Sequence, residues 1–323
     1  MVLKRTKPEF AHHLGVITIK VLFRLGLIRP ASFKNVSAMG LSFNGPLGMA
    51  AGFDKDGELI PELYALGFGH VEVGTVTALA QPGNPKPRMF RLPKDRALIN
   101  RMGFNNHGAK ALADRLRKLR QGSNQLPIIG INLGKSKIVE LDRAAEDYAF
   151  SANHLKGLGD YYVINVSSPN TPGLRELQET EALRAIILAV QREIGSESPL
   201  LIKIAPDLTD EAALEVAKLV NQLGLSGMIA ANTTISRTNL KSRPSKITEA
   251  GGLSGAPLKT RASELLPVLR KELKKDKTII SVGGIETEDE IRSRLESGAD
   301  LVQVYTGFVY GGPFWPKRIQ KNL

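Results

Sequence analysis

Eight short and almost continuously apolar segments recur from residue 46 onward, and they constrain the fold more than any other feature. Segments of this length are typical of strands that are covered on both faces. Helical patterns follow most of them, at 58–66, 142–157, 178–193, 209–223, 260–272 and 286–296. Eight strands that alternate with helices predict an α/β fold, a (β/α)₈ barrel of the TIM-barrel type. A doubly wound open sheet is the structural alternative, but it usually has fewer strands. The apolar segments are 46–51, 70–75, 127–132, 161–166, 199–204, 226–231, 278–282 and 300–305.

Two connections are too long to be turns, and both follow predicted strands. Residues 76–126 contain two arms of a hairpin around Lys94 and Asp95, and residues 232–258 are rich in Ser, Thr and Gly. Long loops in compact domains are usually functional. Barrel enzymes build their sites at the end of the barrel where the strands finish, so we expect both loops to lie beside the site.

Residues 9–28 predict an amphipathic helix with a wide apolar face and a basic stripe of His13, Lys20 and Arg24. The spacing alone favours packing on a core, whereas the stripe and the position fit a helix that lies in a membrane interface. We therefore divide the chain into an N-terminal helical extension, 1–40, for which membrane docking is the second interpretation, and a barrel, 41–323. The apolar face is formed by Phe10, Leu14, Ile17, Val21, Leu25 and Ile28, and it is widened by Val16, Ile19, Leu22 and Phe23.

Charge and composition narrow the classes of function. The 44 basic and 32 acidic residues give a net charge of +12, and residues 1–40 contain seven bases and one acid. This asymmetry indicates an anionic partner, either nucleic acid or a phospholipid surface. The chain has no cysteine and five histidines, which excludes disulfides, thiolate sites and a cysteine catalyst, and no metal site is expected. No apolar run approaches the roughly 18 residues of a membrane span, and no signal peptide is evident, so an intracellular protein is expected.

Polar residues follow each predicted strand, where a barrel carries its catalytic groups. They are amides, hydroxyls and lysines, without a carboxylate pair, and they suit a planar heterocycle and anions. Redox chemistry at such a site would require a cofactor. Glycines after the seventh and eighth strands match the usual phosphate corner of this architecture. In strand order the residues are Lys55, Thr75, Asn132, Asn165 with Ser168, Lys203, Asn232 with Thr233, Gly284, and Tyr305 with Thr306.

Several motifs resemble those of one family. The segment 165–175 (NVSSPNTPGLR) is similar to the catalytic loop of the dihydroorotate dehydrogenases, and 50–58, 100–105, 251–255 and 301–308 resemble its other motifs. The resemblance extends from about Pro8 to Pro313. Soluble members use a cysteine base and quinone-linked members a serine. Because the chain lacks cysteine, has Ser168 at the serine position and begins with a basic amphipathic segment, it is identified as a member of the quinone-dependent (class 2) group.

The resemblance implies oxidation of (S)-dihydroorotate to orotate in pyrimidine (UMP) biosynthesis, with FMN as cofactor and a membrane quinone as acceptor. Ser168 would remove the C5 proton through a relay of Thr171 and an ordered water, while hydride passes from C6 to N5 of FMN. Lys55 would hold the substrate carboxylate or stabilise developing negative charge. Lys203 would stabilise the reduced flavin anion near N1.

The resemblance also implies the remaining binding residues. Ala231 departs from the pattern, in which a threonine often contacts FMN. Those for substrate are Lys55, Asn100, Arg101, Met102, Gly103, Phe104, Asn165, Asn170, Asn232 and Thr233. Those for FMN are Ala51, Gly52, Lys55, Thr75, Asn132, Asn165, Lys203, Ala231, Gly255, Gly284, Tyr305 and Thr306. Those for the quinone entrance are His12 and Arg91.

Two alternatives remain open at this stage. A flavin barrel that acts on RNA, similar to a dihydrouridine synthase, would explain the net charge equally well, although such enzymes generally use a cysteine acid and carry a separate RNA-binding helical domain. A non-catalytic basic barrel that binds nucleic acid would leave the strand-end residues unexplained. The main interpretation instead expects an anionic phospholipid surface, no nucleic acid, no obligatory protein partner, and a peripheral location on the cytoplasmic face of the bacterial inner membrane.

Overall fold

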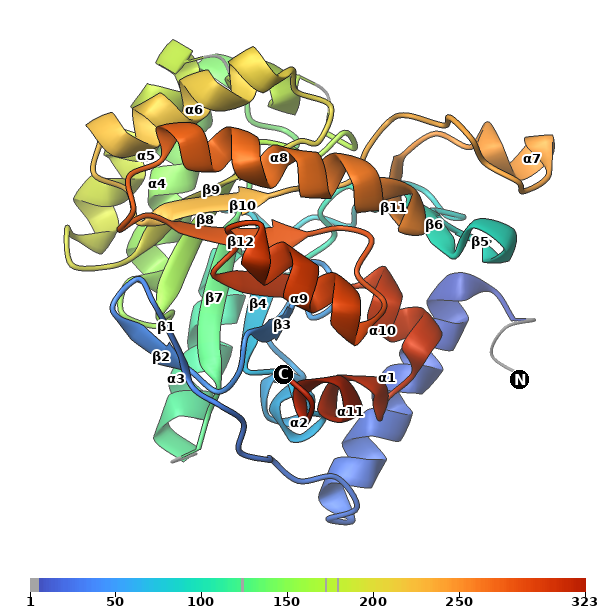
Figure 1. Cartoon of the computed structure of the whole chain (residues 1–323). Coiled ribbons are helices and arrows are strands. Elements are labelled where there is room, and N and C mark those ends of the chain that lie inside the picture. Colours follow the sequence, from blue (N-terminus) through green and yellow to red (C-terminus); the bar gives the residue numbers. More distant parts are fainter. Residues whose placement is uncertain (1–5, 123–124, 172, 179) are drawn as a thin grey trace.

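Eight parallel strands close into a barrel at the centre of the molecule (Figure 1). The computed structural model describes residues 6–122, 125–171, 173–178 and 180–323. Around the barrel the strands follow the order β10, β12, β13, β3, β4, β7, β8, β9, so each predicted strand forms and the (β/α)₈ prediction is confirmed. Their bounds are β3 Leu47–Met49, β4 His70–Val76, β7 Ile128–Leu133, β8 Tyr161–Asn165, β9 Leu200–Ile204, β10 Gly227–Ala230, β12 Thr278–Val282 and β13 Leu301–Val304.

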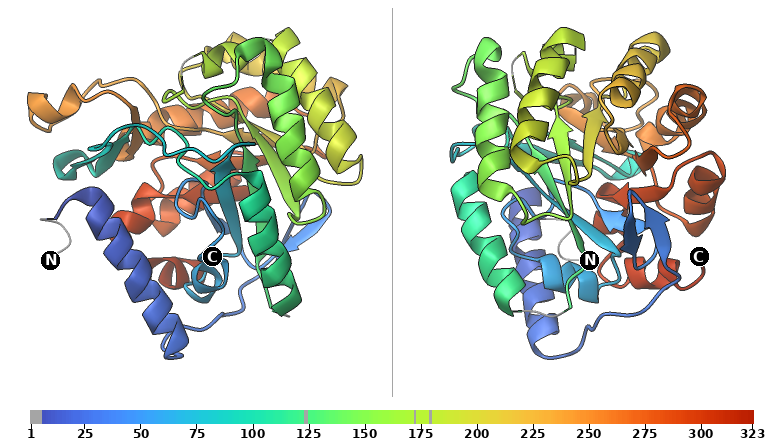
Figure 2. Two further views of the ribbon diagram at one scale, coloured as in Figure 1. Left: turned by 180° about the vertical axis from the view of Figure 1, so that it is seen from behind. Right: turned by 90° about the vertical axis from the view of Figure 1, so that its left-hand side faces the viewer.

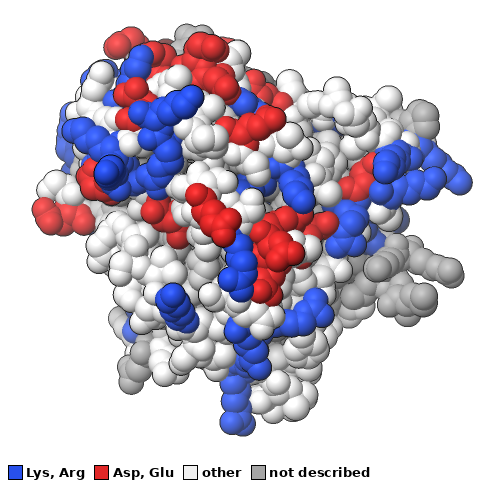
Figure 3. Space-filling view, viewed as in Figure 1, with Lys and Arg blue, Asp and Glu red and all other residues white. Residues whose placement is uncertain are grey.

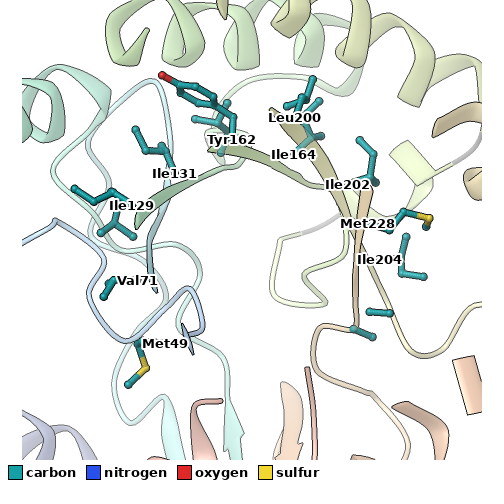
Figure 4. Close-up of a cluster of buried hydrophobic side chains, with 14 of the residues drawn as sticks. Met49, Val71, Ile129, Ile131, Tyr162, Ile164, Leu200, Ile202, Ile204 and Met228 are labelled. Carbon is teal, nitrogen blue, oxygen red and sulfur yellow. The ribbon is translucent and has the colours of Figure 1, made fainter. Parts of the chain in front are cut away.

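The period of two along each strand separates an outer apolar layer from the barrel interior. Ile202 and Ile204 of β9 belong to the larger core cluster outside the barrel, whereas Leu201 belongs to the inner cluster. Figure 4 shows the outer layer, in which side chains of β7, β8 and β9 point towards the surrounding helices. Lys203 has the same phase as Leu201, so its buried side chain lies inside the barrel.

Helices cover the barrel, and each helix predicted from the sequence forms. Two predicted N-caps are confirmed: the Thr209 hydroxyl accepts a hydrogen bond from the Ala212 amide at 3.2 Å, and Thr287 forms a capping box with Glu290. The helices are α1 Pro8–Arg24, α2 Ile60–Ala65, α3 Ala109–Gly122, α4 Ala144–Leu155, α5 Thr180–Ile194, α6 Asp210–Gln222, α7 Pro244–Ile247, α8 Lys259–Glu272, α9 Glu288–Glu296, α10 Thr306–Gly311 and α11 Trp315–Gln320.

One regular helix contradicts the sequence analysis. Helix α3 occupies the end of the 76–126 segment, which we expected to be a long connection. Its buried stripe is narrow, with Leu112, Ala113 and Leu116 facing the core, and most of its other residues are polar. A narrow stripe is sufficient here because the barrel supplies the second apolar surface.

Two small sheets close the ends of the barrel. The hairpin of β1 Val36–Ala38 and β2 Leu41–Phe43 covers the barrel interior at the end where the strands begin. There, Phe43 lies edge-on to His70 with ring centroids 5.3 Å apart. At the opposite end, β5 Met89–Leu92 and β6 Ala97–Asn100 form the hairpin expected around Lys94 and Asp95. Strand β11 Gly252–Gly255, from the second long loop, joins this hairpin through β6. Figure 2 shows this three-stranded sheet and α1 on the same side of the barrel.

Helix α1 ends at Arg24, and it packs on the barrel with the residues that widen the predicted apolar face. Ile19 is buried, with Val16, Leu22 and Phe23 packed beside it. Lys20, a member of the predicted basic stripe, forms an ion pair with Glu58 at 3.3 Å, which offsets its charge. The packing interpretation is therefore confirmed for one face of the helix, and the membrane-interface interpretation stays a prediction for its exposed face. The rest of the predicted apolar face is solvent-exposed, at Phe10 59%, Leu14 40%, Ile17 47%, Val21 46% and Leu25 67%, except for Ile28, which lies beyond the helix and is buried.

Basic side chains are not confined to the N-terminal segment. Figure 3 shows them at the edge of the molecule that carries α7, where Lys241, Arg243 and Lys246 are exposed. Among the described helices, none has the length and apolar character that crossing a membrane requires.

Candidate active site

A cavity lies at the carboxyl ends of the barrel strands, and most residues predicted for the site line it. The long loops complete it, with Met89, Leu98 and Ser254 contributed by the three-stranded sheet. The structure therefore brings together side chains separated by more than 250 positions in the chain. The predicted residues in the lining are Ala51, Gly52, Lys55, Thr75, Asn100, Met102, Gly103, Phe104, Asn165, Ser168, Asn170, Lys203, Ala231, Asn232, Thr233, Gly255, Gly284, Tyr305 and Thr306.

Three predicted residues of the same site are not part of the lining. Asn132 is fully buried and accepts a hydrogen bond from the Thr75 hydroxyl at 2.5 Å, so it supports the wall. Thr171 is buried within the loop after β8. Arg101, directly after the last residue of β6, turns away and forms an ion pair with Glu249 at 2.6 Å.

A network of amides and hydroxyls fixes the floor of the cavity. Asn165 donates from Nδ2 to the Thr75 hydroxyl at 3.0 Å and to Asn132 Oδ1 at 3.1 Å. Its own Oδ1 accepts from the Ser167 hydroxyl at 2.9 Å and from Asn232 Nδ2 at 3.3 Å. Because each amide is held by its neighbours, the donors and acceptors that face the cavity have fixed directions before a ligand binds.

The loop after β8 presents Ser168 to the cavity and is tied down from behind. Ser168 is 5% exposed, and its hydroxyl oxygen accepts a hydrogen bond from the backbone amide of Asn170 at 3.3 Å. Arg175 donates to the carbonyls of Ser167 at 3.1 Å and Thr233 at 3.0 Å. The Arg175 guanidinium thus joins the loop after β8 to the segment after β10, and it fixes the backbone next to Ser168.

Lys55 contributes an ammonium group to the lining of the cavity. The Lys55 ammonium donates to Asn105 Oδ1 at 2.6 Å. Burial, reinforced by the nearby Arg88, lowers the pKa of Lys55 to about 7. The loop that carries it is fixed by Asp54, whose carboxylate accepts from the backbone amide of Leu59 at 2.8 Å. Burial raises the pKa of Asp54 to about 6. A group that is half protonated near neutral pH can respond to an anionic ligand.

Lys203 is paired with a carboxylate that the sequence analysis did not identify. Glu72 of β4 is fully buried inside the barrel, 3.3 Å from the Lys203 ammonium. It also accepts from Asn132 at 2.7 Å, Gln303 at 2.8 Å and Tyr161 at 3.4 Å. The signal was present in the alternation of β4, because Glu72 has the inward phase while Val71 and Val73 face the outer core.

Phe104 lies in the cavity wall with a backbone conformation that is rare for a bulky residue. Its φ is +51°, in the left-handed region, and such strain persists where the surroundings impose it. The ring is packed closely against Gly134: a Cβ there would lie 3.0 Å from the ring and 2.4 Å from the Thr75 methyl group. The aromatic ring is therefore fixed as a cover over one side of the cavity.

A second cavity of about 860 Å³ lies between α1 and the barrel. His12 of α1 contributes to it and stacks edge-on to Phe53, with ring centroids 4.9 Å apart. Burial, followed by the charge of Lys55, lowers the pKa of His12 to about 4, so the ring is neutral at pH 7. Arg91 is outside both linings and donates to the Thr6 carbonyl at 2.7 Å. The two cavities share five residues: Gly52, Lys55, Met89, Met102 and Tyr305.

Comparison with known proteins places these features in a family. The sequence model described as dihydroorotate dehydrogenase matches residues 34–323. A protein of Leifsonia xyli subsp. xyli named dihydroorotate dehydrogenase (quinone) is 52% identical over 100% of this chain and 96% of its own length. A protein of Arthrobacter sp. with the same name is 52% identical over 98% of this chain and 93% of its own.

Solved structures agree. The dihydroorotate dehydrogenase of Eimeria tenella in complex with ferulenol has a TM-score of 0.90 at 37% identity, covering 100% of this chain and 94% of that one. Its ligand-free form has a TM-score of 0.88 at 38% identity, covering 97% and 93%. Sequence and structure lead to one conclusion, which confirms the resemblance seen in the motifs: the chain belongs to the dihydroorotate dehydrogenase family.

Proposed function

We propose that this chain oxidises (S)-dihydroorotate to orotate in pyrimidine (UMP) biosynthesis, with bound FMN as its cofactor and a membrane quinone as its electron acceptor. The observation that carries the proposal is the convergence of Ser168, Lys55 and Lys203 on one cavity whose remaining polar groups are amides and hydroxyls. The similarity to proteins named as quinone-dependent dehydrogenases supports the choice of acceptor.

The residues present fit FMN. Gln303 lines the cavity, and its buried Oε1 has no hydrogen-bond partner among the described residues, as expected of an acceptor for a heterocyclic N–H. Gly255, with φ +100°, and Gly284, with φ +73°, bring backbone close to the cavity beside the Thr306 hydroxyl, as an anion cradle requires. When bound, FMN supplies the acceptor for the hydride from substrate C6. Lys203 would favour negative charge on the reduced ring.

The substrate would be held by Lys55 and by asparagine side chains of the same cavity. Lys55 provides the cation for the dihydroorotate carboxylate, and asparagines such as Asn100, Asn170 and Asn232 match the alternating donors and acceptors of the pyrimidine edge. Phe104 would exclude water from that edge.

Ser168 is proposed as the base that removes the C5 proton. A serine hydroxyl is almost never ionised at neutral pH and therefore needs a route for its proton. Thr171, three residues on and buried in the same loop, is the proposed partner, through an ordered water. Arg175, which fixes the loop carbonyls, would keep this relay in position.

The second cavity is the proposed quinone site, with His12 and Arg91 at its entrance and α1 as the membrane contact. The exposed apolar face of α1 supports this location, because it has the character of an interfacial helix. We therefore propose that residues 1–40 act as a docking extension for 41–323, on an anionic phospholipid surface at the cytoplasmic face of the bacterial inner membrane. Family membership removes the support for the RNA-directed alternative.

One experiment tests the proposal as a whole. The protein is purified, its absorbance spectrum is recorded for bound flavin, and dihydroorotate is added without oxygen. We expect a flavin spectrum that dihydroorotate bleaches and that a quinone restores. Dihydrouridine in RNA is the matched control and should leave the spectrum unchanged. A flavin-loaded protein that dihydroorotate does not bleach would contradict the proposed activity.

A further inference from the structure

The carboxylate of Glu72 lies inside the barrel, next to the cavity but outside its lining. It is 0% exposed and meets donors from four other strands: Asn132 of β7, Tyr161 of β8, Lys203 of β9 and Gln303 of β13. A buried carboxylate surrounded in this way is costly to build without partners, and removing one partner from such a cluster is destabilising. A packing role alone therefore does not account for a carboxylate at position 72.

Three of the four hydrogen-bond donors to Glu72 connect it to the cavity wall. Lys203 and Gln303 line the cavity themselves. Asn132 holds Thr75 and Asn165, which also line it. The neighbouring titratable rings contribute no charge, because burial lowers the pKa of His70 to about 3 and raises that of Tyr161 well above its ordinary value. The charge at the floor of the site is thus set by Glu72 and Lys203 together.

We propose that Glu72 is a positioning residue that fixes the Lys203 ammonium and offsets its charge, and so sets the reduction potential of the flavin that the site holds. This inference rests on the proposed function, in which Lys203 adjoins FMN. A lone cation in a low-dielectric interior would stabilise reduced flavin strongly and would hinder electron transfer to the acceptor. The paired carboxylate weakens that stabilisation, so the flavin can be both reduced by substrate and reoxidised.

The test is the midpoint potential of the bound flavin, measured by equilibration with a reference dye at saturating FMN. Glu72→Gln keeps the side-chain shape and removes the charge. We expect the equilibrium to move at least tenfold towards the reduced form, which is about 30 mV for a two-electron couple. Glu72→Asp keeps the charge but withdraws it by one methylene, so the shift should have the same sign and be smaller. Tyr161→Phe is the matched control, because it removes one donor to Glu72 without changing charge, and its potential should equal that of the wild type.

A double-variant cycle shows whether Glu72 acts through Lys203. In a Lys203→Met background, Glu72→Gln should raise the potential by less than it does with Lys203 present, because the position of the ammonium no longer contributes. An unchanged potential in both Glu72 variants, or an equal shift with and without Lys203, would overturn the inference. The two proposals fail differently: a wild-type protein that binds no FMN, or whose FMN dihydroorotate does not reduce, contradicts the proposed function. A wild type that does both, with variants of unaltered potential, contradicts only the role of Glu72.

Discussion

Lys55 illustrates how burial makes a single residue sensitive to pH. Its pKa is lowered to about 7, so the free protein loses this cation as pH rises through 7. A bound carboxylate favours the ammonium and raises its pKa, so orotate binding should take up a proton above pH 7. We expect the dissociation constant of orotate to be flat below pH 7 and to increase by up to tenfold per unit above it.

Spectral titration of the holoprotein with orotate between pH 6 and 9 measures this dependence. Lys55→Met should bind orotate more weakly and without the dependence. Equal affinity for orotate at pH 6 and pH 9 in the wild type would show that Lys55 does not meet the ligand carboxylate.

Ser168 allows a second prediction at this scale. Ser168→Ala should slow flavin reduction by dihydroorotate by roughly 10²–10⁴, the usual contribution of a positioned base. FMN content should be retained, because the proposed contact is with substrate. Ser168→Cys should recover part of the rate, since a thiol ionises more readily than a hydroxyl. Stopped-flow absorbance is the measurement, and a near-normal rate in the alanine variant would remove Ser168 from the mechanism.

The residues differ in how well the sequence predicts them. Those at strand ends, such as Lys55 and Ser168, are predictable because parallel strands finish at one end of a barrel. Glu72 and Gln303 lie within strands that look almost wholly apolar, and their importance follows from the inward phase alone. Arg101 shows the opposite error: it stands between two lining residues, Asn100 and Met102, but its side chain turns away to Glu249.

At the level of elements, the period of a helix predicts that α1 has a wide apolar surface but not which part of it packs. The fit of the helix to the barrel surface decides which part packs: Ile19 reaches the core, whereas Ile17 and Val21 remain exposed. We expect Leu14→Ser, Ile17→Ser and Val21→Ser together to weaken binding to vesicles that contain anionic lipid, because buried apolar area contributes to interfacial affinity. Flavin reduction by dihydroorotate should not change.

Vesicle co-sedimentation measures this effect. Leu188→Ser is the matched control, since Leu188 is exposed to a similar degree, 46%, on α5, and its vesicle binding should remain normal. Undiminished vesicle binding by the triple variant would place the membrane contact elsewhere.

At the scale of the whole molecule, the barrel and the N-terminal extension are expected to serve different half-reactions. The cavity at the strand ends receives its lining from residues 50–307, whereas the second cavity depends on α1. Deletion of residues 1–35 should therefore preserve flavin reduction by dihydroorotate and abolish turnover with a long-chain quinone. Steady-state assays with the quinone and with a water-soluble dye acceptor separate the two effects. Normal turnover of the long-chain quinone by the shortened protein would show that α1 is ordinary packing on the barrel.

The wall shared by the two cavities also determines how inhibitors should behave. Met89, Met102 and Tyr305 line both cavities. Under the proposed function, dihydroorotate would bind in the first cavity and the quinone in the second, so neither would have to leave before the other enters. A compound lodged beneath α1 should then block the acceptor without competing with dihydroorotate, and a pyrimidine analogue should show the reverse pattern. A ligand that extended from His12 in the second cavity to Ser168 in the first would compete with both reactants at once, so one molecule placed across the shared residues could stop both proposed half-reactions.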